Sequence, residues 1–152
     1  MGKAMFYHLT RRPVEDTLGM ILGKARQAGW RVVVRGTSQE RLNWLDEKLW
    51  LGPEDSFVPH GIAGGAHDAM QPILLTCSTD LTNAATCVIL IDGAEVSEEE
   101  VETLERTCVL FDGNAEDALS KAREQWQKIK TAGLIAEYWS EESGAWEKKA
   151  QT

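Results

Sequence analysis

Short apolar runs alternate along this chain with longer segments whose apolar residues recur at helical spacing. The short runs predict strands over residues 4–9, 31–35, 72–76, 87–91 and 107–111. The helically spaced segments predict helices over residues 13–28, 38–50, 97–105 and 114–132. Strands that alternate with helices are typical of α/β proteins with a largely parallel sheet. We therefore expect a three-layer α/β/α sandwich around about five strands, Rossmann-like but without a nucleotide-binding motif.

Capping residues mark several of the predicted helix ends. Ser38 is a candidate N-cap of the second helix, and Ser97 followed by Glu100 has the spacing of a capping box. Asn114 is a candidate cap of the last helix. Gly29 ends the first helix, since glycine is the commonest residue just beyond a helix.

Two segments depart from the strand–helix alternation. Residues 52–70 form a long loop region, and loops of this length in compact domains are usually functional. Near the C-terminus, Tyr138, Trp139 and Trp146 flank a polar turn, which predicts a terminal hairpin or strand-turn segment. We expect one domain over residues 1–147 and a frayed tail over residues 148–152.

The composition is that of an ordinary globular domain. The chain has 152 residues, of which 43% are hydrophobic and 26% charged, and this length suits one domain with a real core. No apolar run could span a bilayer, and the N-terminus lacks a signal-peptide pattern. We therefore expect a cytoplasmic protein with no membrane partner.

The charge balance argues against broad contact with DNA. The formal net charge is −8, because 24 acidic residues outnumber 16 lysines and arginines, whereas proteins that bind duplex DNA usually present a basic face. A small local basic patch is compatible with this total. DNA is therefore expected as an indirect partner.

Motifs for cofactors and metals are absent. Neither Gly-x-Gly-x-x-Gly nor Gly-x-x-x-x-Gly-Lys-Ser/Thr occurs, and the glycine-rich residues 61–65 do not join a strand to a helix start. Cys77, Cys87 and Cys108 lie in or beside apolar runs without close Cys-x-x-Cys pairs, so we expect buried free thiols. The sequence predicts no cofactor and no metal.

Two carboxylates leave an alternative open. Asp92 and Asp112 each follow a predicted strand, at the edge where parallel sheets bind ligands. They could serve a small nucleotide- or metal-dependent α/β enzyme. An Asp-Gly pair after a strand is also ordinary turn chemistry, and this interpretation is favoured.

The last predicted helix carries a candidate binding surface. Its core-facing stripe leaves Arg123 and Lys130 on one flank, with Leu119 and Trp126 between flank and core. An aromatic ring beside two cations suits an acidic peptide with an apolar end. On periodicity alone, a half-buried Trp126 with solvated charges beside it is the favoured interpretation.

A family resemblance rests on segments that keep one order along most of the chain. The most specific block joins Leu45-Asp46-Glu47-Lys48-Leu49-Trp50 to Ser56-Phe57-Val58-Pro59-His60. The other segments are Phe6-Tyr7-His8-Leu9, Gly29-Trp30-Arg31-Val32-Val33-Val34, Gln71-Pro72-Ile73-Leu74-Leu75, Phe111-Asp112-Gly113, Ala122-Arg123-Glu124-Gln125-Trp126 and Ala132-Gly133. The pattern resembles the chi subunit of the bacterial DNA polymerase III holoenzyme, a clamp-loader accessory protein.

The resemblance implies a site for the acidic C-terminal tail of the single-stranded-DNA-binding protein. By this resemblance, Trp50, Arg123 and Trp126 fall on the family's tail-binding positions. The chain departs from the family in two respects. Trp126 stands where tyrosine is typical, and Leu119 replaces a basic residue, so that Lys121 or Lys130 would have to compensate.

The resemblance also implies a second partner and no catalysis. The psi subunit would meet the loop around Phe57, with Val58, Pro59 and His60. Another clamp-loader protein, or a DNA-repair helicase, could use the same surface. The expected function is a non-catalytic adaptor that links the clamp-loader complex to the single-stranded-DNA-binding protein.

Overall fold

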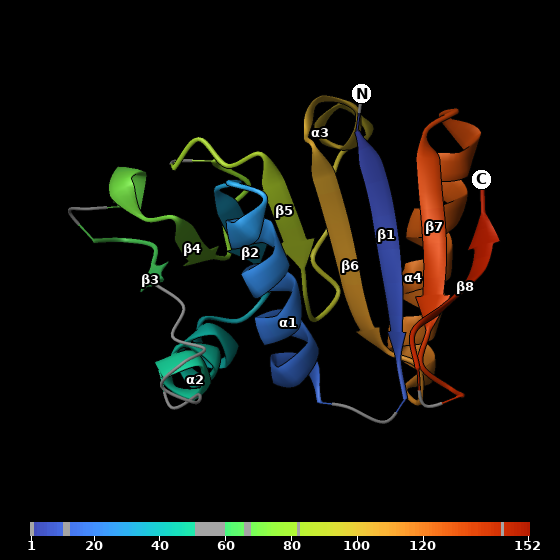
Figure 1. Cartoon of the computed structure of the whole chain (residues 1–152), viewed down its shortest axis with the longest axis horizontal. Coiled ribbons are helices and arrows are strands. Elements are labelled where there is room, and N and C mark those ends of the chain that lie inside the picture. The colour runs from blue at the N-terminus through green and yellow to red at the C-terminus, as the bar shows by residue number, and fades with distance from the viewer. Residues whose placement is uncertain (1, 11–12, 51–59, 66–67, 82, 144) are drawn as a thin grey trace.

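The strands of the protein form one continuous sheet. The computed structural model describes residues 2–10, 13–50, 60–65, 68–81, 83–143 and 145–152, apart from the side chains of residues 49 and 50. The sheet has eight strands in the order β3-β4-β2-β5-β6-β1-β7-β8 (Figure 1). The strands are β1 (Lys3–Leu9), β2 (Val32–Arg35), β3 (Gly61–Ile62), β4 (Ile73–Thr76), β5 (Cys87–Leu90), β6 (Arg106–Asp112), β7 (Ile135–Ser140) and β8 (Glu147–Gln151). Neighbours are parallel except β7 and β8, which are antiparallel.

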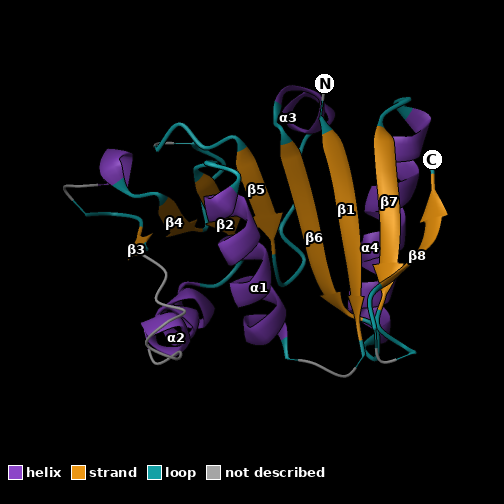
Figure 2. Cartoon of the chain, in the orientation of Figure 1, coloured by secondary structure: helices purple, strands orange, loops and turns teal. Residues whose placement is uncertain are grey.

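Helices pack on both faces of this sheet (Figure 2). They are α1 (Val14–Gln27), α2 (Gln39–Trp50), α3 (Glu98–Thr103) and α4 (Glu116–Thr131), with a short 3₁₀ turn, η2, at Asp68–Met70. α1 and α2 contribute Leu22 and Leu42 to one buried cluster, and α3 and α4 contribute Val101 and Ile129 to the other. The predicted α/β class and the largely parallel sheet are confirmed.

The period-two geometry of the strands explains the two clusters. In β2, Val32 and Val34 belong to the α1–α2 cluster, while Val33 between them belongs to the α3–α4 cluster. All three side chains are buried, because a parallel sheet covered on both sides has no solvent-facing side. This is why the central strands are nearly continuous apolar runs.

The structure corrects the expected strand number and the tail. Among the described residues the sheet has eight strands instead of about five, because β3, β7 and β8 extend it at its two edges. The predicted terminal hairpin is confirmed by β7 and β8. The expectation that residues 148–152 fray is wrong: the backbone of β8 pairs with β7, and the Thr152 hydroxyl bonds Leu134 and Ala136. β8 is an edge strand held by backbone pairing with β7 alone, and its side chains are all exposed. Because none of them is buried, the sequence of this segment shows no alternation of apolar and polar residues that would predict a strand.

The structure confirms the predicted helix caps at Ser97 and Ser38 but not the one at Asn114. Ser97 and Glu100 form the complete capping box of α3, and Ser38 Oγ accepts the Arg41 backbone N–H at 3.4 Å. The prediction for Asn114 is wrong, because α4 begins one residue later with Ala115 at the cap and no side-chain bond. Asn114 instead donates its side-chain amide to the Thr10 carbonyl at 3.2 Å, a contact distant in sequence.

None of the described helices combines the length and apolar content needed to cross a membrane. The longest, α4, has 16 residues and carries charges along much of its surface. This agrees with the absence of long apolar runs.

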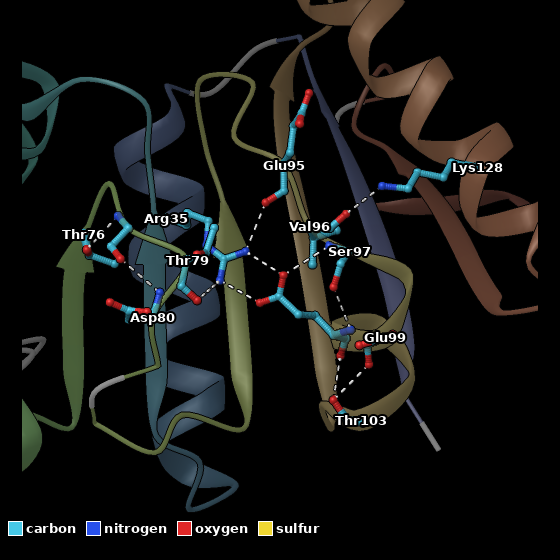
Figure 3. Close-up of polar contacts among 12 residues, drawn as sticks. Arg35, Thr76, Thr79, Asp80, Glu95, Val96, Ser97, Glu99, Thr103 and Lys128 are labelled. Atoms are coloured by element: carbon cyan, nitrogen blue, oxygen red, sulfur yellow. Dashed lines mark hydrogen bonds and ion pairs between the residues drawn. The ribbon is translucent and has the colours of Figure 1, made fainter.

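A buried arginine holds the α3 side of the sheet together (Figure 3). Arg35 ends β2 with a side chain that is 3% exposed. Its Nη1 donates to the Glu95 carbonyl at 3.0 Å and its Nη2 to the Thr79 carbonyl at 3.2 Å. Both nitrogens also donate to the Glu100 carboxylate, at 3.2 and 2.8 Å. The guanidinium thus joins β2 to the segments before β5 and β6 and to α3, with its charge paired bidentately.

Glu100 serves this pair and the helix cap together. Burial acts to raise the pKa of its carboxyl, but hydrogen bonds from Arg35 and Ser97 outweigh burial, so that the pKa lies below its ordinary value of 4.5. The carboxylate is therefore charged at neutral pH, and its removal would leave the Arg35 charge buried and unpaired.

We predict that Glu100→Ala lowers the free energy of unfolding by about 3 kcal/mol, because removing one partner of a buried ion pair leaves the other uncompensated. Denaturant unfolding monitored by circular dichroism measures the change. Glu99→Ala is the matched control: it removes an exposed carboxylate from the same first turn and should change stability by about 0.5 kcal/mol or less. Equal losses in both variants would show that Arg35 does not depend on Glu100.

Candidate functional site

An aromatic cluster lies where α4 crosses the sheet. The Trp126 ring meets Phe6 of β1 edge to face, with centroids 5.3 Å apart, and Tyr138 of β7 at 5.9 Å. His8 stacks on Phe111 of β6 at 5.3 Å. The Tyr138 hydroxyl and His8 Nδ1 are hydrogen-bonded at 2.8 Å. Edge-to-face and stacked rings at these separations stabilise one another beyond simple burial.

Strand register brings these rings together. Phe6 pairs with Tyr138 across β1 and β7, and His8 pairs with Phe111 across β1 and β6. Since alternate residues of a strand share a face, all four lie on the α4 side. Gly113 is required beside them, because a Cβ at that position would collide with the His8 ring.

A stripe of α4 residues borders the cluster. Leu119 and Trp126 are half-buried, and Arg123 and Lys130 are exposed. At about 100° per residue these four positions fall within roughly 60° of one another on the helix surface. We call them the α4 stripe. It presents two cations beside half-buried apolar surface, which suits carboxylates and an apolar side chain on one peptide.

Tyr138 extends the α4 stripe onto the sheet. Burial raises the pKa of its phenol above the ordinary 10.0, the positive charge of Arg123 lowers it, and the negative charge of Glu142 raises it. Arg123 and Glu142 therefore act on the pKa of the half-buried Tyr138 phenol in opposite directions. Tyr138 was not predicted as a site residue. The period-two pattern of β7 could have identified it, but this strand was predicted only as part of a terminal hairpin.

Lys121 does not lie with the α4 stripe. It projects about 160° around the helix from Arg123, where its Nζ is 3.6 Å from Glu95 Oε1. On that flank, Gln125 and Lys128 donate to the backbone carbonyls of residues 94 and 96 at 3.3 and 3.2 Å. Of the two lysines expected to compensate for Leu119, the geometry brings Lys130 to Arg123 and leaves Lys121 apart.

Trp50 is the last residue of α2, and its side chain lies outside the described residues. α2 packs over the β3–β4 edge on the α1 face, whereas α4 packs over β6 and β7 on the other face (Figure 1). The structure therefore does not bring the end of α2 to the α4 stripe. The role of Trp50 in tail binding stays a prediction.

Of the predicted partner-binding loop, which carries Phe57, Val58, Pro59 and His60, the structure describes only His60. Phe57, Val58 and Pro59 lie outside the described residues. The His60 side chain has no exposed area, and its Nε2 lies 3.0 Å from Asp46 Oδ1 and 3.3 Å from the Asp46 carbonyl. His60 therefore braces its segment against α2, and its side chain cannot itself present a surface to a partner in this arrangement.

A cleft of about 470 Å³ opens at the C-terminal ends of β5 and β6. Asp92 and Asp112 both line it, so the structure does bring these carboxylates together. Each already has a local role: Asp92 accepts from Arg41 Nε at 3.1 Å, and Asp112 accepts the Asn114 backbone N–H at 2.9 Å. The Asp112 contact is a turn contact of the kind that the favoured interpretation predicted, whereas the ion pair of Asp92 with Arg41 was not predicted.

Thiols and metal ligands add no further site. Within the described parts of the chain, no three His, Cys, Asp or Glu side chains are grouped so that they could hold a metal. All three cysteines are free, but the expectation of burial is wrong for Cys77, which is exposed just beyond β4. A hydrogen bond with Cys87, together with burial, raises the pKa of Cys108, so that thiol stays protonated.

Comparisons with known proteins agree with the resemblance seen in the sequence. The family model described as DNA polymerase III chi subunit, HolC, matches residues 1–137. DNA polymerase III subunit chi of Escherichia coli (strain K12) is 24% identical over 141 residues, which cover 88% of this chain and 95% of that protein. The probable DNA polymerase III subunit chi of Rickettsia prowazekii (strain Madrid E) is 20% identical over 117 residues, or 74% and 71% of the two chains.

We predict that Arg123→Ala raises the pKa of Tyr138 and that Glu142→Gln lowers it, because a positive neighbour stabilises the phenolate and a negative one opposes it. Tyrosinate absorbance against pH measures both. The titration is done in a Tyr7→Phe background, since Tyr7 is the other tyrosine and its pKa is also raised by burial. Shifts absent from both variants would mean that neither charge faces the ring.

Proposed function

The chain belongs to the DNA polymerase III chi family, whose members are accessory subunits of the replicase, and from this membership we propose a non-catalytic adaptor. One surface would bind the acidic C-terminal tail of the single-stranded-DNA-binding protein. A second would join the clamp-loader complex. The observation that carries the proposal is the α4 stripe with its adjoining aromatic cluster.

The α4 stripe supports tail binding through charge and shape together. Arg123 and Lys130 would take carboxylates of the tail, and Trp126 with Leu119 would take an apolar side chain. Trp126 rests on Phe6 and Tyr138, so its orientation is held before any ligand binds. A preformed aromatic surface reduces the ordering cost of binding.

The acidic body gives the α4 stripe its selectivity. A net charge of −8 opposes bare nucleic acid, whose affinity for proteins rests on many phosphate contacts. A short tail needs only the local field of two cations. The adaptor would therefore favour protein-coated template over naked DNA and would hold the replicase there by raising its effective concentration.

The second surface would be the loop that carries Phe57, Val58 and Pro59. His60, braced by Asp46, would position this loop and not contact the partner itself. The psi subunit is the expected occupant, with another clamp-loader protein or a DNA-repair helicase as the alternatives. Capture of partners with and without Phe57→Ala separates these.

The rival function is a small enzyme that uses the cleft between Asp92 and Asp112. The observation that favours it is that both carboxylates line one cleft at the ligand-binding edge of a parallel sheet. Against it, both carboxylates are engaged in local contacts.

We predict that a synthetic peptide copying this tail from the same organism binds the protein, and that Arg123→Ala weakens binding about tenfold or more. Hydrogen bonds to charged groups contribute about 1.5–3 kcal/mol. Calorimetric titration measures the change, and binding should also weaken as salt is added.

Arg26→Ala is the matched control, because Arg26 is an exposed cation near the end of α1 and should not alter affinity. Trp50→Ala tests the remaining predicted residue. A loss like that of Arg123→Ala keeps Trp50 in the tail site, and no loss removes it. Unchanged binding in Arg123→Ala would refute the α4 assignment.

For the rival function, we predict no rise in melting temperature with nucleotides or divalent metals. A ligand at a hundred times its Kd stabilises a fold by about 2.7 kcal/mol, which a thermal-shift assay detects readily. A rise that disappears in Asp112→Asn would instead establish a ligand site in the cleft.

A further inference from the structure

α2 repeats the side-chain spacing of the α4 stripe. An arginine, a tryptophan three residues later and a lysine four residues after that occur as Arg41, Trp44 and Lys48. The same spacing and order in α4 give Arg123, Trp126 and Lys130. At about 100° per residue the three α2 positions also lie within roughly 60° of one another. We call them the α2 stripe.

The α2 stripe is an assembled surface and not only a sequence pattern. Trp44 is half-buried and packs against the core beneath α2. The guanidinium carbon of Arg41 lies 4.4 Å from the centroid of the indole ring, and Lys48 Nζ lies 5.4 Å from it. Cations stacked on an indole are attracted to its face. The ring therefore holds two positive groups in place, which reduces the rotamer freedom lost when a ligand binds.

The cations remain able to exchange partners. Arg41 pairs with Asp92 at 3.1 Å, with side chains 31% and 30% exposed, and pairs this exposed contribute little stability. An incoming carboxylate could replace Asp92 at small cost. Lys48 is exposed.

We propose that the α2 stripe is a second binding surface for an acidic peptide with an apolar side chain between its carboxylates. The inference rests on the proposed function for the class of ligand, but on a different helix and different residues. Arg41 and Lys48 lie seven residues apart, about 10.5 Å along the axis, which is the span of about three residues of extended peptide.

The surroundings of the α2 stripe favour a peptide over nucleic acid. Glu40, Glu47 and Asp92 lie next to its cations in the chain or in space. A single strand would carry successive phosphates past these carboxylates, whereas a short peptide engages only the two cations and the ring. Single-strand binders line a longer positive groove with several stacking rings.

The two stripes can be occupied together. α2 and α4 lie on opposite faces of the sheet and pack against different edges (Figure 2). One short tail cannot cover both, so each chain would bind two tail segments. Two modest contacts to a partner that presents several tails would hold it far more firmly than either contact alone.

The test is calorimetric titration of the whole chain with the same tail peptide, read for stoichiometry. Wild type should bind two peptides per chain, Lys48→Glu one, Arg123→Glu one, and the double variant none. Arg26→Glu makes the same change of charge on α1 and should still bind two. Circular dichroism melting of each variant establishes that it is folded.

The outcomes separate this inference from the proposed function. If wild type binds one peptide, and this site is lost in Arg123→Glu but unaffected by Lys48→Glu, the inference is overturned and the proposed function stands. One site lost only in Lys48→Glu supports the inference and refutes the α4 assignment. No binding to wild type overturns both. A single-stranded oligonucleotide that binds through Trp44 and Lys48, where the peptide does not, overturns the assigned class of partner.

Discussion

A buried guanidinium organises this molecule. Removing a charged group from water costs several kcal/mol unless it is paired. The two Nη atoms of Arg35 offset that cost by bonding two backbone carbonyls and both oxygens of Glu100, although its buried Nε has no hydrogen-bond partner. Those partners lie in α3 and in the loops that follow β4 and β5. Arg35 therefore helps to fix the position of α3 and of the connection that leads to it, together with buried Val101 (Figure 3).

That connection also holds the functional helix. Arg35 fixes the Glu95 carbonyl from one side, while Gln125 and Lys128 of α4 bond residues 94 and 96 from the other. One flank of α4 is thus committed to structure. The opposite flank packs its aromatic residue on β1 and β7 and leaves its cations exposed. A helix held along one side presents the other in a constant orientation, which suits the binding role proposed for it.

The charge distribution is consistent with the same role. The chain is acidic overall, yet α2 and α4 each align two cations with a tryptophan. Net charge governs long-range repulsion, whereas contacts at a few ångströms govern recognition of a short peptide. The two effects act at different distances, so an acidic protein can present local sites for acidic ligands.

The sequence by itself determined the α/β class, the approximate positions of α1, α2, α3 and α4, the capping box at Ser97 and the grouping of Arg123 with Trp126 and Lys130. All of these follow from interactions within about four residues, where periodicity and caps act. Only the tertiary structure decided that residues 147–151 form an edge strand, that Asn114 bonds Thr10 instead of capping α4, and that Lys121 lies beside Glu95. It also placed Tyr138 beside both His8 and Trp126. The partners in these contacts are separated by many residues, and their choice depends on strand order and register, which no local pattern encodes.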